Sequence, residues 1–356
     1  MSWYENTIVQ EDLKMISQQD LPYDNFFGRN VLVTGATGML ASYLVDFFIF
    51  LNKTQNAKIN IFVLARSKNK IADRFGKAVN DQYFHSVIQD IVNPIILPNI
   101  SSIDYIFHAA GNASAQAMRN SPVSIWTANV IGMHNVLELA RVSNATQVHF
   151  FSTREVYGNQ LTNKTRLTEN DFGVLDPLNP RAVYPESKLA SESLMAAYKK
   201  QFGQAFTISR IAHSYGPGMS ITNDGRIMSD LIGNVVRHEN ISLISSGQSE
   251  RAFLYIADAI AGILHIVLKG GNGQAYNLSN EDQPIKIVDL ARKLSTLFAE
   301  KHLRVTFISS DQSGYSSIPR VALDSSKLEK IGWHKRISLD SGLRRTVQSF
   351  EIEGIK

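Results

Sequence analysis

The segment RAVYPESKLASE, residues 181–192, places Tyr184 four residues before Lys188 in a stretch with helical character. One turn of helix separates the two side chains, so they share a face and can act on the same small molecule. A phenol has a reference pKa of about 10 and is a poor base at neutral pH unless nearby positive charge stabilises the phenolate. Lys188 can supply that charge. The pair is therefore a candidate proton-transfer unit, the alternative being two ordinary residues on a helix surface.

A second candidate is the glycine-rich stretch VLVTGATGMLA, residues 31–41, in which a predicted strand runs into Gly35-x-x-Gly38-x-x-Ala41 and then a helix. Gly35 permits a tight turn, Gly38 lets backbone approach a pyrophosphate, and Ala41 lets helix and strand pack closely. The start of the helix then offers N–H groups and a favourable dipole to phosphate. Strand, spacing and helix agree, so the stretch predicts a dinucleotide site rather than a plain strand-to-helix turn.

The ends of the next two predicted strands bear on which dinucleotide binds. An acidic residue after the second strand would bind the ribose 2′-hydroxyl of NAD, but this strand ends in FVLARSK, with Arg66 and Lys68. A basic residue suits the extra phosphate of NADP, whereas the other interpretation is a solvated loop charge. Asp90 and Ile91 follow the third strand, where a carboxylate can reach the adenine amino group or cap a helix. The predicted cofactor is NAD or NADP.

These candidate sites must be positioned by a larger framework. Apolar runs typical of strands alternate with amphipathic, helix-like segments; the runs are residues 30–34, 59–65, 105–110, 148–153 and 206–211. This βαβ rhythm predicts an α/β fold with a Rossmann-type, doubly wound parallel sheet that is buried on both faces.

The rhythm loosens after about residue 212, which predicts a smaller C-terminal α/β lobe that binds substrate. We expect an N-terminal extension over 1–27, a mainly dinucleotide-binding domain over 28–212, and a mainly substrate-binding lobe over 213–356 that returns some chain to the first domain. Smaller elements are expected within these parts: a helix from about Thr7 to Gln19 that stops before Pro22, a short strand at 252–256 and a helix near 284–299.

Composition limits the possible classes of protein. The chain has 356 residues, 44% of them hydrophobic and 19% charged, which is enough to bury a large core. It has no cysteine, so disulfides, thiolate metal sites and a cysteine nucleophile are excluded, and a cytoplasmic location is expected. The net charge of +4 is spread along the chain without a nucleic-acid-binding motif, which favours a phosphorylated small molecule as partner. No metal site is indicated.

A membrane location is also not expected. The most apolar helix-like run, residues 40–51, is too short to span a bilayer and contains Asp46. The N-terminus lacks the basic start and apolar core of a signal peptide.

Several further motifs occur in a consistent order. Besides TGATGMLA and YPESK they are HAAG (108–111), Asn129 in TANVIG, STREVYG (152–158), RIAHSYGPG (210–218), DGRIMSDLI (224–232), RAFLYIADAI (251–260) and LEKIGW (328–333). From about residue 28 onwards the chain resembles the extended short-chain dehydrogenase/reductases, the NAD-dependent epimerase/dehydratase family that acts on nucleotide sugars. The second half is most similar to UDP-glucuronate decarboxylases.

The resemblance implies roles for individual residues. Tyr184, with Lys188, would take the proton from the sugar C4 hydroxyl as hydride passes to the cofactor, and Thr153 would hydrogen-bond the same sugar oxygen. Glu155 would lie beside the sugar ring and assist chemistry at C5 and C6; otherwise it is a buried glutamate with a basic neighbour. The implied cofactor-binding residues are Gly35, Thr37, Gly38, Met39, Arg66, Asp90, Ile91, Ala109, Ala110, Tyr184 and Lys188. The implied substrate-binding residues are Thr153, His213, Arg226 and Arg251, with Tyr215 helping to shape the pocket.

Three positions depart from the family pattern. Arg154 stands where 4,6-dehydratases carry an aspartic acid that protonates the leaving hydroxyl, and a guanidinium cannot donate that proton at neutral pH. This argues against a conventional dehydratase. His213 stands where relatives commonly have an asparagine near the substrate phosphates, and Gly218 where decarboxylases have an arginine.

Two enzymatic hypotheses and one non-enzymatic hypothesis follow from these observations. The first is redox-neutral chemistry with tightly held NAD⁺, either UDP-glucuronate decarboxylation or 4-epimerisation. The second is reduction of a nucleotide-linked 4-ketosugar by NADPH, which Arg66 and Lys68 favour. The third is a non-catalytic cofactor-binding protein. Helices predicted around 122–142 and 181–201 match those that pair in relatives, so a homodimer is expected.

Overall fold

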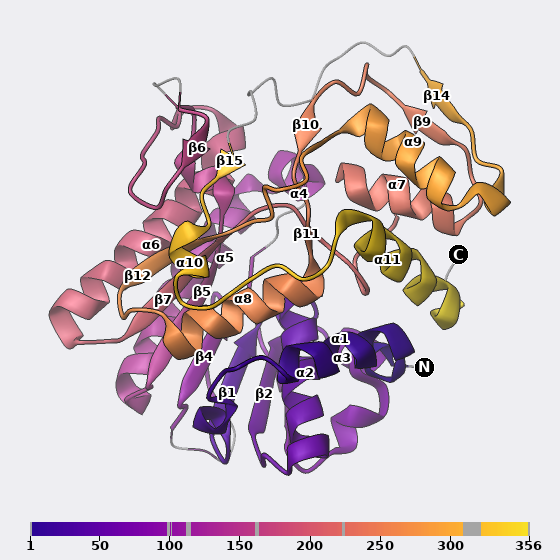
Figure 1. Ribbon diagram of the computed structural model, residues 1–356. Helices are drawn as coiled ribbons and strands as arrows, with labels where there is room; N and C mark the ends of the chain where they lie inside the picture. The colour runs from indigo at the N-terminus through magenta and orange to yellow at the C-terminus, as the bar shows by residue number, and fades with distance from the viewer. Residues whose placement is uncertain are drawn as a thin grey trace.

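A computed structural model describes residues 2–97, 100, 102–111, 115–160, 164–222, 225–308 and 322–354. Within these residues a seven-stranded sheet has the order β12-β7-β5-β4-β1-β2-β3, and every neighbouring pair is parallel (Figure 1). The strands are β1 (Asn30–Thr34), β2 (Asn60–Ala65), β3 (Phe84–Ile88), β4 (Tyr105–His108), β5 (Gln147–Thr153), β7 (Phe206–Ile211) and β12 (Gln274–Leu278). The predicted doubly wound parallel sheet is confirmed, with the order reversing between β1 and β4.

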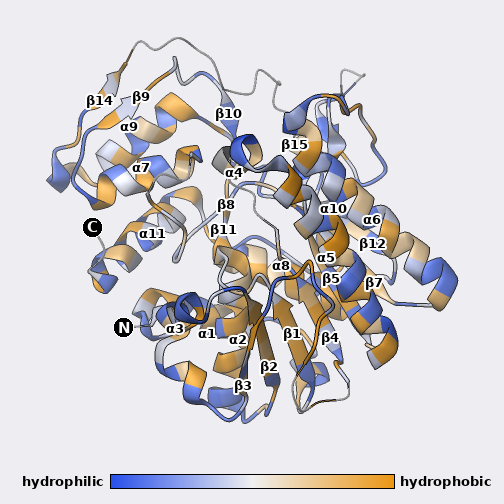
Figure 2. Cartoon of the chain, turned by 180° about the vertical axis from the view of Figure 1, so that it is seen from behind, coloured by the Kyte–Doolittle hydropathy of each residue, from blue (hydrophilic) through white to orange (hydrophobic). Residues whose placement is uncertain are grey.

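Both faces of the sheet are buried under helices. Successive side chains of a strand point to opposite faces, so neighbouring residues of one strand join different cores. Val31 and Val33 of β1 join a core with helices α2 (Met39–Gln55) and α8 (Ile256–Lys269). Leu32, between them, joins a second core with α5 (Pro122–Ser143) and α6 (Val183–Phe202). Figure 2 shows the hydrophobic colouring of β1, β2 and α8. The near-continuous apolar strand sequences follow from this double burial.

The strand β12 comes from the second half of the chain and pairs with β7 at one edge of the sheet. Sequence analysis did not identify it, because QAYNL is short and mixes polar with apolar residues. The proposed division of the chain into three parts remains a prediction.

A second group of elements lies together beyond the sheet, at the upper right of Figure 1. It contains α7 (Ile227–Val236), α9 (Ile287–Leu297), the parallel pair β9 (Ile241–Leu243) and β14 (Val305–Phe307), and the antiparallel pair β10 (Glu250–Arg251) and β13 (Ile285–Lys286). The strand expected at 252–256 is shorter, β11 (Leu254–Tyr255), and pairs in parallel with β8 (Ser214–Tyr215). The helix expected near 284–299 is α9.

Two of the remaining elements, α1 (Thr7–Ser17) and α11 (Leu339–Glu353), are longer helices near the ends of the chain, and the others are short or peripheral. These others are η1 (Trp3–Glu5), η2 (Tyr23–Phe26), α3 (Lys68–Phe75), η3 (Gly76–Asn80), α4 (Ala115–Asn120), η4 (Arg154–Tyr157), β6 (Arg166–Leu167), η5 (Pro180–Ala182), η6 (Ala299–Lys301), β15 (Ala322–Leu323) and α10 (Ser326–Glu329). In the described part of the chain, no helix combines the length and apolar character needed to cross a bilayer.

The N-terminal helix α1 begins where it was predicted, at Thr7, and is capped by Asn6, whose side chain accepts a hydrogen bond from the Ile8 N–H at 3.1 Å. It packs against α2, α8 and α11. Figure 1 shows α1 and α11 beside each other, so helices from the first and last parts of the chain pack together.

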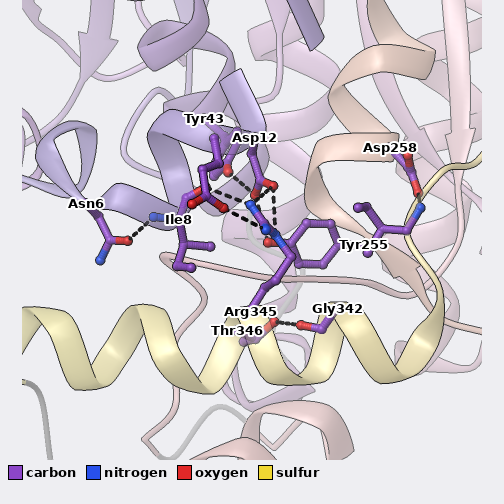
Figure 3. A network of polar contacts seen from close by, with 11 residues as sticks. Asn6, Ile8, Asp12, Tyr43, Tyr255, Asp258, Gly342, Arg345 and Thr346 are labelled. Carbon is purple, nitrogen blue, oxygen red and sulfur yellow. Dashed lines mark hydrogen bonds and ion pairs between the residues drawn. The ribbon is translucent and has the colours of Figure 1, made fainter. Parts of the chain in front are cut away.

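A buried carboxylate joins these distant parts (Figure 3). Asp12 of α1 is 0% exposed and accepts hydrogen bonds from the hydroxyls of Tyr43 at 2.6 Å and Tyr255 at 2.7 Å. The Arg345 guanidinium of α11 donates to the same carboxylate at 2.6 Å. We call these four residues the Asp12 network. It connects α1 with α2, β11 and α11.

Candidate active site

The turn between β1 and α2 has the geometry expected of a dinucleotide-binding turn. Gly35 has φ = +64°, and a Cβ added there would lie 2.7 Å from the Cα of Ala110. Only glycine therefore fits between the ends of β1 and β4. Gly38 caps α2, and its N–H donates to the Gly35 carbonyl at 2.9 Å. The turn thus lies against Ala109 and Ala110 at the point where the strand order reverses, which is where open α/β sheets bind ligands.

The start of α2 is accessible at this turn. Gly38 is exposed, while Thr37 and Met39 are half-buried. The first N–H groups of an α-helix have no acceptor within the helix and favour anions. The arrangement therefore fits the pyrophosphate of a dinucleotide.

The ends of β2 and β3 are linked by a charged pair. The Arg66 guanidinium lies 3.9 Å from the Asp90 carboxylate; Arg66 is well exposed and Asp90 is partly exposed. Asp90 also accepts the Val92 N–H at 3.2 Å, so it caps its own turn. The Ile91 side chain is buried against α5, where a Cβ added at Gly132 would lie 3.0 Å from it. Ile91 therefore contributes to the core, which leaves only its backbone for a ligand.

Tyr184, Lys188 and Thr153 come together from α6 and the end of β5. All three are buried, with Tyr184 7% and Lys188 4% exposed. The Thr153 side chain lies close enough to the Tyr184 phenol to lower the pKa of that phenol. The Lys188 ammonium donates to the Phe151 carbonyl at 2.9 Å and lies 6.0 Å from the centre of the Tyr184 ring. The structure thus brings together the three residues that the resemblance implied for proton transfer.

Burial governs the protonation of this group. Burial lowers the pKa of Lys188 to about 7, although the Glu192 carboxylate opposes the shift. Burial also raises the pKa of Tyr184 above its ordinary value, and the charge of Glu155 adds to this rise. The nearby Thr153 side chain and the charges of Arg181 and Arg226 lower the pKa of Tyr184 and so oppose this rise. Tyr184 therefore holds its proton at neutral pH until more positive charge comes close.

Two buried polar atoms near these residues have no hydrogen-bond partner within the described chain, Asn129 Oδ1 and His108 Nε2. The other amide atom of Asn129, Nδ2, donates to the Ser187 hydroxyl at 2.8 Å. A Cβ added at Gly111 would lie 2.4 Å from Asn129 Oδ1 and 3.5 Å from the Lys188 ammonium. Buried polar atoms are nearly always satisfied, so unpartnered atoms beside a glycine fit a site that receives a polar ligand.

Glu155 and Arg226 lie close enough to Tyr184 to affect its pKa, and they come from different parts of the fold. Glu155 is in η4, directly after β5, and its carboxylate lies 3.3 Å from the Arg181 guanidinium. Arg226 precedes α7 in the second group of elements. Sequence analysis gave no role to Arg181, although it lies three residues before Tyr184 in the quoted motif. The second group of elements therefore comes close to Tyr184 through Arg226.

His213 pairs with Arg154, the residue that departs most from the family pattern. Arg154 Nη1 lies 3.3 Å from His213 Nε2, and the His213 ring lies 5.9 Å from the ring of Phe253. Arg251 is in β10, two residues before Phe253, and its guanidinium donates to the Glu250 carbonyl at 2.7 Å.

Tyr215 is buried, and its hydroxyl donates to the Leu339 carbonyl of α11 at 3.3 Å. It therefore supports the wall behind this region. Within the described residues, no cluster of three or more histidine, aspartate or glutamate side chains could hold a metal ion.

Comparisons with known proteins identify the family of this chain. The model of the NAD dependent epimerase/dehydratase family matches residues 31–279. The chain is 30% identical to UDP-glucuronic acid decarboxylase 6 of Arabidopsis thaliana over 92% of this chain and 91% of that protein. It is 28% identical to UDP-glucuronic acid decarboxylase 1 of Xenopus tropicalis, over 96% of this chain and 75% of that protein.

Solved structures show the same fold at lower identity. The UDP-glucose 4-epimerase of Thermotoga maritima, with UDP-glucose, aligns with a TM-score of 0.76 at 21% identity, covering 91% of this chain and 99% of that one. DesIV, a dTDP-glucose 4,6-dehydratase of Streptomyces venezuelae with NAD bound, gives 0.75 at 22% identity, covering 91% and 97%. The extent of the family match, together with the decarboxylase relatives, shows that this chain belongs to the NAD dependent epimerase/dehydratase family.

Proposed function

We propose that this protein is a nucleotide-sugar-modifying enzyme that oxidises the sugar at C4 with a nicotinamide cofactor, as a UDP-glucuronate decarboxylase-like enzyme. The observation that carries the proposal is the buried Tyr184 phenol, with the buried Thr153 side chain close to it and Lys188 one helical turn away. The two relatives described above are UDP-glucuronic acid decarboxylases, and Arg154 replaces the proton donor that a conventional 4,6-dehydratase needs. A 4-epimerase would use the same first step.

The cofactor site that we propose consists of Gly35, Gly38 and Met39 at the pyrophosphate, with Ala109 and Ala110 forming the wall. A nicotinamide dinucleotide bound there supplies a hydride acceptor and later returns the hydride. The glycine turn that tolerates no Cβ and the unpartnered Asn129 oxygen both fit such a group. We favour NAD, because Asp90 lies beside Arg66 and partly offsets the charge that would attract the extra phosphate of NADP.

Tyr184 carries the proton in this proposal. Its raised pKa keeps it neutral in the resting protein, and added positive charge beside Lys188 lets it become the base that takes the C4 hydroxyl proton. Thr153 holds the sugar oxygen while this happens. In the reverse step Tyr184 returns the proton to the same oxygen.

Oxidation at C4 makes a uronic acid a β-keto acid. The C5–C6 bond then breaks, CO₂ leaves, and the electron pair stays on C5 as an enolate that takes up a proton. Hydride return at C4 completes a redox-neutral cycle. We assign Glu155 to the protonation at C5, because it lies in the turn that Thr153 caps and its charge raises the pKa of Tyr184.

A second candidate function is NADPH-dependent reduction of a nucleotide-linked 4-ketosugar, which the exposed Arg66 after β2 favours. Two measurements separate the candidates. We expect the purified protein, once denatured, to release stoichiometric NAD⁺, and the native protein to convert UDP-glucuronate to CO₂ and a UDP-pentose without added cofactor. Cofactor-free protein that consumes NADPH with a 4-ketosugar would overturn the decarboxylase proposal.

The proposed assembly is a homodimer formed through α5 and α6. These helices pack against each other and expose large apolar side chains, namely Val123, Trp126, Ile131 and Val142 on α5 and Phe202 on α6. Apolar side chains gathered on one surface are typical of interfaces. Light scattering at micromolar concentration should give the dimer mass, and a monomer there would contradict the assembly.

A further inference from the structure

Arg154 is held at a fixed position beside the catalytic residues. It begins η4, which is capped by the Thr153 hydroxyl accepting the Glu155 N–H at 3.2 Å. Val156 and Tyr157, later in the same turn, are buried, and the Tyr157 hydroxyl donates to Asn277 at 2.5 Å. The two residues next to Arg154 in the sequence, Thr153 and Glu155, both affect the pKa of Tyr184. The Arg154 side chain therefore starts from a rigid turn next to the predicted position of sugar C4.

The partner of Arg154 is equally well fixed. A guanidinium only donates hydrogen bonds, so His213 Nε2 accepts from Arg154 across the 3.3 Å contact, and the ring proton is on Nδ1. The His213 carbonyl accepts the Leu254 N–H at 3.0 Å, and its ring contacts Phe253. Arg154 follows β5 and His213 follows β7, which are adjacent parallel strands. The two side chains thus meet at the carboxyl edge of the sheet, where ligands bind.

The surrounding charge favours an anion. Arg181 and Arg226 also act on Tyr184, and the nearby carboxylate of Glu155 is engaged by Arg181. A guanidinium carries paired N–H groups that match the two oxygens of a carboxylate, so an arginine suits this kind of anion. Decarboxylases carry an arginine at the position of Gly218. An arginine there is disfavoured in this chain, because the backbone at Gly218 has φ = +79°, a conformation that residues with a side chain rarely adopt. Arg154 instead supplies a cation from another backbone position.

We propose that Arg154 and His213 form an anion-binding pair that selects a nucleotide sugar with a carboxylate at C6. The inference rests on the proposed function, which places sugar C4 at Tyr184 and C6 nearby. Arg154 binds the carboxylate, and His213 orients the guanidinium. Arg154 is thus a specificity-determining residue of this chain rather than an acid.

The test compares the binding of three ligands to the full-length protein by calorimetry: UDP-glucuronate, UDP-glucose and UDP. We expect Arg154→Ser to weaken UDP-glucuronate binding by about tenfold or more, while UDP-glucose and UDP change by less than about twofold. Arg154→Lys should restore part of the loss, because it returns the charge without the planar fork. His213→Asn should give a smaller loss with the same ligand dependence. Arg292→Ser, an exposed arginine on α9, is the charge-matched control and should change none of the three.

Two results would overturn the pair. Equal weakening of all three ligands by Arg154→Ser would assign the arginine to the diphosphate, and no weakening of any ligand would remove it from the site. Circular dichroism and bound-cofactor content show whether each variant is folded.

Failure of the anion-binding pair can be distinguished from failure of the proposed function. If Arg154→Ser weakens uronate binding but the wild-type protein never oxidises C4, the anion-binding pair is supported and the enzymatic proposal is overturned. If the wild-type protein oxidises neutral nucleotide sugars and binds UDP-glucuronate no more tightly than UDP-glucose, oxidation at C4 is supported and the anion-binding pair is overturned.

Discussion

The candidate active site and the Asp12 network are both buried and polar, but they differ in how completely their groups are satisfied. Asp12 accepts hydrogen bonds from two tyrosines and an arginine. In the candidate site, Asn129 Oδ1 has no partner within the described chain. Burial also lowers the pKa of Lys188 to about 7, so its charge is poorly compensated. A structural network satisfies its own polar groups, whereas a binding site leaves some of them for a ligand.

The largest expected effect comes from Tyr184→Phe, which removes the proton carrier from the site and leaves the packing of the ring. We expect kcat to fall by about a thousandfold, within the usual range for loss of a general acid–base group. Thermal stability and bound cofactor should stay as in the wild type. Tyr198→Phe, on the same helix with its hydroxyl bonded to Glu138, is the matched control and should keep its activity. A Tyr184→Phe variant with the kcat of the wild type would contradict the role of Tyr184 as the proton carrier.

The second test applies to the Asp12 network. Asp12→Ala leaves the Arg345 guanidinium without its main partner and two buried tyrosine hydroxyls without an acceptor. We expect the free energy of unfolding to fall by about 3–5 kcal/mol, as for other broken buried pairs. Urea denaturation measures this loss. The exposed Asp340, paired with Lys293 at 2.8 Å, gives the control variant Asp340→Ala, which should cost less than about 1 kcal/mol. A small loss at Asp12 would mean that the network does not hold the chain ends together.

The same two regions show what sequence can and cannot predict. The glycine turn, Tyr184, Lys188 and Thr153 lie in short contiguous motifs whose spacing reflects local geometry, so their proximity followed from strand order and the resemblance. Asp12 and Arg345 are 333 positions apart, and each looks like a surface charge in its own helix. No local pattern signals that tertiary packing will bury one of them. The His213 contact with Arg154 was missed for the same reason, since it depends on β5 and β7 being neighbours.

A third test uses the pH dependence of stability. The pKa of Lys188 falls from 10.5 to about 7 in the folded, ligand-free protein. As the pH falls through this window the unfolded chain binds a proton that the folded chain does not, so the free energy of unfolding decreases. Lys188→Met should therefore lose less stability than the wild type between about pH 9.5 and pH 7. Parallel pH slopes for the two proteins in urea denaturation would show that the pKa of Lys188 is not lowered in the folded protein.

The smallest effect is expected at the rim of the cofactor site. Arg66 is exposed and already lies near Asp90, so Arg66→Ala should weaken NADP⁺ binding by only about three- to tenfold and change NAD⁺ binding by less than about twofold. Fluorescence titration of cofactor-free protein measures both affinities, and the difference should shrink at high salt. Arg29→Ala is the control, because this exposed arginine precedes β1 at the opposite end of the strands and pairs with Asp104 at 3.4 Å. A loss of NADP⁺ binding far above tenfold would mean that Arg66 binds the phosphate despite Asp90, and the reductase would then be the better assignment.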